Sequence, residues 1–131
     1  MQQRRALTHN GICHLILEVH RPELPGTAAG GRIESFLSAV ETTVQTRAEQ
    51  ALPRLAAHYE SDPDPRKRFR HRPYLLSLSF EITEPGRYLR MRAVLRLSKS
   101  GRTLFEKEKA ARFDLRSGRL LRCETNRNRF L

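Results

Sequence analysis

The segment from residue 74 to residue 97 reads YLLSLSFEITEPGRYLRMRAVLRL and contains two runs of alternating apolar and polar residues. In the first run the large apolar side chains share one parity: Leu76, Leu78, Phe80 and Ile82. This alternation predicts a β-strand with one buried face, and the second run predicts another. The turn residues at 84–87 leave no room for a crossover, so the two strands are expected to be antiparallel neighbours.

A third strand is predicted on the C-terminal side, from Thr103 to about Phe113, after a turn at 99–102. Leu104, Phe105 and Phe113 do not share a parity, which predicts one register shift or bulge. Residues 113–121 then indicate the end of this strand, a turn and a short strand, with Gly118 free to take a positive φ angle.

A helix is predicted on the N-terminal side. Apolar residues recur there in steps of three and four: Ile33, Phe36, Leu37, Val40, Val44, Ala48, Ala51, Leu52 and Leu55. This stripe indicates an amphipathic helix from about Gly31 to Leu52, which Pro53 should end or kink. Residues 12–20 alternate loosely and predict a first strand.

These elements predict one α+β domain over residues 1–131, with one long amphipathic helix packed on a four- to five-stranded, mainly antiparallel sheet in β-α-β-β-β-β order. The first strand could pair with any of the later ones. Residues 61–73 are expected to form a flexible basic loop, and residues 1–10 and 124–131 to fray.

The charge is the unusual feature of the composition, because 25 Lys and Arg stand against 14 Asp and Glu, for a net charge of +11. Such a surplus attracts polyanions. The candidate binding surface consists of Arg90, Arg92 and Arg96 on one outward strand face and Arg66, Lys67, Arg68, Arg70 and Arg72 in the loop. Alternatively, these cations form an ordinary solvated surface, or pair across strands with Glu81, Glu106 and Glu108.

No spacing typical of a catalytic site, a phosphate-binding glycine loop or a zinc site is found, so neither enzymatic activity nor a cofactor is predicted. His14, Glu18 and His20 share a strand face but span roughly 20 Å, too far for one metal ion. The sequence shows no secretion signal and no apolar run of membrane-spanning length, so a cytoplasmic protein is expected. Cys13 and Cys123 are expected to be reduced, although a single bridge stays open for an exported protein.

The helix with Ile33, Phe36, Leu37 and Val40, the strand from Tyr74 to Ile82, and Phe113-Asp114-Leu115 followed by Ser117-Gly118 carry a resemblance that spans most of the chain. They resemble a bacterial domain family of unassigned function. It occurs in the extracytoplasmic part of lysozyme-sensing anti-sigma factors and beside some peptidoglycan deacetylase domains. The resemblance implies a sensing or binding module without catalytic residues, in which Asp114 and Gly118 are turn residues.

Two functional hypotheses follow. The first is non-enzymatic binding of a protein or other macromolecular partner, with the outward arginine face as the first surface to test. The second is nonspecific nucleic-acid binding through that face and the basic loop, although no outward aromatic pair is predicted to stack bases. An exposed strand edge would also allow a homodimer by sheet extension.

Overall fold

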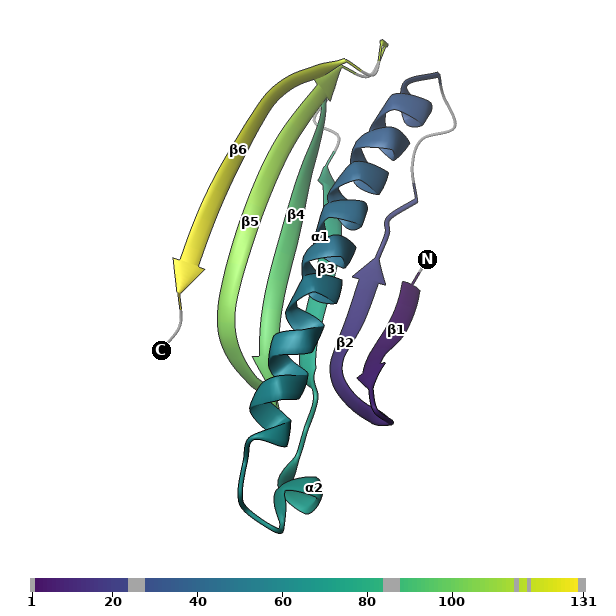
Figure 1. Ribbon diagram of the computed structural model, residues 1–131. Coiled ribbons are helices and arrows are strands. Elements are labelled where there is room, and N and C mark those ends of the chain that lie inside the picture. Colours follow the sequence, from purple (N-terminus) through teal and green to yellow (C-terminus); the bar gives the residue numbers. More distant parts are fainter. Residues whose placement is uncertain (1, 24–27, 84–87, 115, 118, 130–131) are drawn as a thin grey trace.

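The computed structural model describes residues 2–23, 28–83, 88–114, 116–117 and 119–129. Six strands form one curved sheet in chain order, and a long helix lies on its inner face (Figure 1). The elements are β1 (Gln2–His9), β2 (Ile12–His20), α1 (Ala28–Glu60), α2 (Lys67–Arg70), β3 (Tyr74–Thr83), β4 (Tyr88–Lys99), β5 (Arg102–Asp114) and β6 (Leu120–Arg129). The α+β class with one long helix is confirmed, but the sheet has six strands where four or five were predicted.

Antiparallel pairing joins every pair of neighbouring strands except β2 and β3, which are parallel, so the sheet is mixed. The predicted antiparallel pairing of β3 with β4 is confirmed. The predicted irregularity in β5 is confirmed too, because the β4–β5 register shifts at Leu97 and Ser98 and passes over Leu104. The turn predicted at 84–87 lies outside the described residues.

Both ends of the chain contain strands where frayed segments were predicted. Strand β1 pairs with β2 through a two-residue turn at Asn10 and Gly11, whose φ angles are 53° and 76°. An Asn-Gly pair readily adopts these left-handed angles, so it is a strong hairpin signal. Residues 124–129 belong to β6, which pairs with β5. The backbone pairs in both places although the sequence is polar.

The predicted end of the helix near Leu52 is wrong, because α1 continues through Pro53 to Glu60. Beyond the proline, Ala56 is buried and Leu55 packs against the core. We attribute the continuation of the helix to this packing, which offsets the loss of the backbone hydrogen bond that proline cannot donate. Segment 61–73 contains the short helix α2. Asp62 and Asp64 each accept a hydrogen bond from a backbone N–H group, and both form ion pairs with Arg70.

The core is one cluster between α1 and the inner face of the sheet. Its fully buried side chains include Ile33 and Leu37 from α1, Leu78 from β3, Met91 from β4 and Phe113 from β5. The backbone of α1 approaches β1 and β2 most closely, so the inner face of β4 and β5 is less completely covered. Within the described part of the chain, no helix is long and apolar enough to cross a membrane.

The two cysteines lie in strands that are far apart. Cys13 is a free thiol near the start of β2, whereas Cys123 lies in β6 opposite Ala111. Three strands separate β2 from β6, which corresponds to roughly 19 Å of sheet. A disulfide needs Cα atoms within about 7 Å, so the two cysteines of one chain cannot form a bridge in this fold.

Candidate functional site

The outward arginines of β4 are largely paired within the sheet. Arg92 bonds to Glu81 at 3.3 Å and to Glu108, and Arg96 bonds to Glu106 at 2.7 Å. The hydrogen bond that Arg92 donates to Glu108 is the main cause that raises the pKa of Arg92 above its ordinary value. Two of the three predicted binding residues on this face therefore already have carboxylate partners, as the cross-strand alternative anticipated.

Arg90 is placed differently, because it lies directly opposite Arg112 of β5. The guanidinium of Arg112 stands 5.9 Å from the ring centroid of Tyr88. Arg90 pairs with Thr83, at the end of β3 remote from Tyr74, whereas α2 precedes Tyr74. Arg90 therefore lies at the opposite end of β3 and β4 from the basic loop. The two parts of the predicted binding surface do not join there.

The predicted cations of the loop are also mostly engaged. Arg70 bonds to Asp62 and lies 3.3 Å from Asp64, which Arg66 approaches at 3.8 Å. Lys67 lies 3.4 Å from the carbonyl oxygen of Glu60, and Arg72 donates to the carbonyl oxygens of Phe69 and His71. Arg68 is exposed and makes no ion pair with a described residue. The carboxylates of Asp62 and Asp64 therefore offset the charge of Arg66 and Arg70, whereas Lys67 and Arg72 contact carbonyl oxygens and keep their charge.

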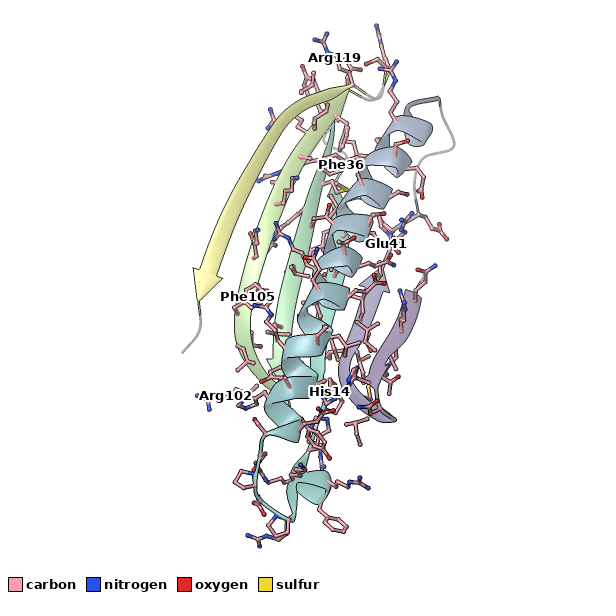
Figure 2. All side chains as sticks on the ribbon, viewed as in Figure 1. His14, Phe36, Glu41, Arg102, Phe105 and Arg119 are labelled. Carbon is pink, nitrogen blue, oxygen red and sulfur yellow. The ribbon has the colours of Figure 1, made fainter. Side chains whose placement is uncertain are left out.

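The structure instead presents a groove between α1 and the inner face of β3, β4 and β5, with a volume of about 280 Å³. Phe36 lies on the side of α1 that faces this groove (Figure 2). The lining residues from α1 are Phe36, Ala39, Val40, Thr43, Val44 and Arg47, and those from the sheet are Leu78, Ala93, Leu95, Lys107, Glu108 and Lys109. Most of this surface is apolar.

Positive charge borders the apolar floor. Lys107 and Lys109 point to the inner face because they share the parity of the buried Ala111 and Phe113. The ammonium of Lys109 stands 5.4 Å from the ring centroid of Phe36. Glu108 also borders the groove, but its carboxylate is bound by Arg92. The groove therefore combines apolar surface with the cations Arg47, Lys107 and Lys109.

The described lining carries few polar groups besides its charged side chains. Thr43 is the only hydroxyl-bearing residue among the described lining residues, and its Oγ1 donates to the carbonyl oxygen of Ala39. Among those residues there is no nucleophile beside a general base. Likewise, no group of three or more His, Cys, Asp or Glu in the described ranges is placed to hold a metal ion.

Sequence reasoning did not identify the groove, because its existence depends on where α1 crosses the sheet. One signal was present: in β5 the parity that carries Ala111 and Phe113 also carries two lysines. An inner strand face that changes from apolar to cationic indicates the edge of a covered region. Comparison with known proteins adds no assignment, since no protein-family model and no curated protein matches the chain.

Proposed function

We propose that the protein is a non-enzymatic binding module that receives an acidic, amphipathic segment of a protein partner in the groove between α1 and β4–β5. The observation that carries this proposal is the apolar floor bordered by Arg47, Lys107 and Lys109. A segment that carries both apolar side chains and carboxylates would complement both parts of this surface.

The dimensions of the groove favour a protein segment. Its volume of about 280 Å³ is just below the usual range for enclosed small-molecule sites, about 300–1,000 Å³. A groove of this size accommodates a few side chains from a longer chain, and Val40 and Leu95 supply partly exposed apolar surface for them. The contact of Lys109 with Phe36 holds one cation beside that surface.

The family resemblance described above, which rests on the helix, the strand from Tyr74 to Ile82 and residues 113–118, implies a binding module and so favours the same class of function. Asp114 makes turn contacts here: its N–H donates to the carbonyl oxygen of Arg119, and its Oδ1 accepts from the N–H of Arg116. The resemblance implies a turn role for Asp114 and Gly118. Gly118 lies outside the described residues.

The test uses two fluorescein-labelled peptides of about ten residues, one alternating Leu with Glu and one alternating Leu with Lys. We expect fluorescence anisotropy to show saturable binding of the Leu-Glu peptide only. Replacing both groove lysines, in Lys107→Glu/Lys109→Glu, should weaken that binding roughly tenfold or more, because two favourable charges become repulsive.

The matched control is Arg54→Glu/Arg68→Glu, which changes the net charge by the same amount at two exposed positions outside the groove. It should retain most of the affinity. Equal losses in the two double variants would mean that net charge alone attracts the peptide, and the groove would then not be the binding site.

Nonspecific nucleic-acid binding through the outward face is the second hypothesis, and it has less support because Arg92 and Arg96 are paired with glutamates. Labelled random-sequence DNA is expected to bind weakly at about 50 mM salt and to be lost by about 200 mM. Binding that survives the higher salt and disappears in Arg90→Glu/Arg92→Glu/Arg96→Glu would favour nucleic acid over the protein partner.

A further inference from the structure

Four of the five histidines gather at the end of the molecule where α1 finishes. His9 ends β1, His14 lies in β2, His58 lies in the last turns of α1, and His71 precedes β3. In Figure 2 His14 lies beside the C-terminal part of α1, close to α2. The fifth histidine, His20, lies at the opposite end of β2 beside Glu18.

Three aromatic rings from three separate segments form the centre of this cluster. The ring centroids of His14 and Tyr59 are 5.4 Å apart, those of His14 and His71 are 5.2 Å apart, and those of Tyr59 and His71 are 4.8 Å apart. Nε2 of His71 lies 2.8 Å from the carbonyl oxygen of Cys13. Because a carbonyl can only accept, Nε2 carries the proton and donates it to this oxygen.

A polar cavity of about 100 Å³ adjoins these rings. Lys67 and Lys99 border it, and their ammonium groups stand 5.2 Å from the ring centroid of Tyr59 and 4.7 Å from that of Tyr74. Asp62 is the only described carboxylate in the lining, and it is bound by Arg70. The cavity therefore has a positive charge balance before any histidine is protonated.

The histidines increase this charge when they take up protons. Burial lowers the pKa of His14, the charges of His71 and His9 lower it further, and only Glu60 opposes them. His14 is only 2% exposed, so its charged form has little solvent to stabilise it. An anion in the cavity would supply the missing opposite charge and would favour protonation.

One hydrogen-bond donor at the site also lacks a partner. The hydroxyl of Tyr59 is buried and has no hydrogen bond to any described residue. Buried polar groups are nearly always satisfied, and Tyr59 is among the residues that line the cavity, so this unpaired hydroxyl is consistent with a ligand beside it. A volume of about 100 Å³ is large enough to hold a small ion.

We propose that this cavity binds a small, doubly charged oxyanion of the sulfate or phosphate type, and that binding is coupled to proton uptake by the surrounding histidines. Lys67, Lys99 and the neighbouring histidines supply the positive charge and the N–H donors that such an anion needs. Affinity should therefore rise as the pH falls through the range in which histidine titrates. This site is separate from the groove, and its test does not depend on the function proposed there.

The test is calorimetric titration of the protein with sodium sulfate at about pH 5.5 and about pH 7.5, at constant ionic strength. Sulfate keeps its double charge over this range, so any pH dependence comes from the protein. We expect saturable binding at the lower pH and at least roughly tenfold weaker binding at the higher pH. The measured heat should change with the ionisation enthalpy of the buffer, because protons are taken up.

Two variants locate the site. His71→Gln keeps an amide that can donate to the carbonyl oxygen of Cys13, and Lys99→Gln removes a lining charge at the end of β4. Each should weaken sulfate binding roughly tenfold at the lower pH. The controls His20→Gln and Arg68→Gln remove one histidine and one exposed charge outside the lining and should bind sulfate like the unmodified protein.

Absence of saturable binding at the lower pH would overturn the proposal, and so would equal weakening by the lining and control variants, which would indicate general charge attraction. If His71→Gln does not fold, Lys99→Gln decides the question. Titrations with inorganic phosphate and with O-phosphoserine then distinguish two sources of the anion. Tighter binding of inorganic phosphate indicates a free ion, and tighter binding of O-phosphoserine indicates a phosphate group carried on a side chain of a larger molecule.

Discussion

Replacing Phe113 by alanine is expected to lower the free energy of unfolding by about 3–5 kcal/mol. The side chain is 1% exposed, and its ring packs edge-to-face on that of Phe36 with the centroids 5.3 Å apart. Leu89, directly opposite on β4, is fully buried. Removing the ring therefore leaves a cavity where α1, β4 and β5 meet. Urea denaturation followed by circular dichroism measures the loss.

Phe69→Ala is the matched control, because the same ring is removed from a side chain that is 83% exposed. Its effect should stay below about 0.5 kcal/mol. A loss in Phe113→Ala of less than about 1 kcal/mol would contradict the packing described for this end of the sheet.

Replacing Arg21 by methionine is expected to cost about 3–5 kcal/mol, because it leaves the carboxylate of Glu41 buried without its partner. Nε of Arg21 donates to Glu41 at 2.7 Å, and its other nitrogens reach Glu34 and Ser38. Burial by itself would lower the pKa of Arg21, but the hydrogen bond and charge of Glu41 outweigh burial and raise it. Glu41 is only 8% exposed, so little solvent reaches its carboxylate, and the amide of Gln45 approaches it only at 3.5 Å.

The double variant Arg21→Met/Glu41→Leu removes both charges and should recover most of the lost stability. Arg5→Met is the surface control: Arg5 pairs with Glu49 at 3.1 Å, but both side chains are more than half exposed. That change should cost less than about 1 kcal/mol. A double variant as unstable as Arg21→Met would show that the loss comes from packing and not from the unpaired carboxylate.

The elements that were predicted from sequence are those whose side chains face the core. The alternation of β3 and β4 and the helical stripe from Ile33 to Leu55 follow directly from burial of one face. The same reasoning did not identify β1, since Leu7 is its only buried side chain and residues 2–5 are exposed. An edge strand is held by backbone hydrogen bonds, which any residue type except proline can make, so its sequence need not alternate. The Asn10-Gly11 turn was the only strong sequence signal for β1.

The candidate sites were less predictable, because they depend on where separate segments meet. The pairing of Arg92 with Glu108 could be anticipated from cross-strand alternation, although the exact register could not. The histidine cluster draws on residues as distant in the chain as His14 and His71. It forms because β2 and β3 are parallel neighbours, which places the start of each strand at the same end of the sheet. Many pairings of β2 are compatible with its sequence, so this neighbourhood was not predictable.

The parallel pairing of β2 with β3 also constrains the order in which the chain can fold. Leu15 of β2 pairs with Tyr74 of β3, so the whole of α1 must be made before β2 can pair with β3. In contrast, β3, β4 and β5 are joined by short connections. Closing the longer loop costs more entropy, and non-local pairing of this kind is slow. During synthesis from the N-terminus, the β1–β2 hairpin therefore emerges first but completes its interactions only after β3 has followed. The apolar face of Leu15, Leu17 and Val19 meets α1, which is made before β3, so it is the free edge of β2 that waits for the later strand.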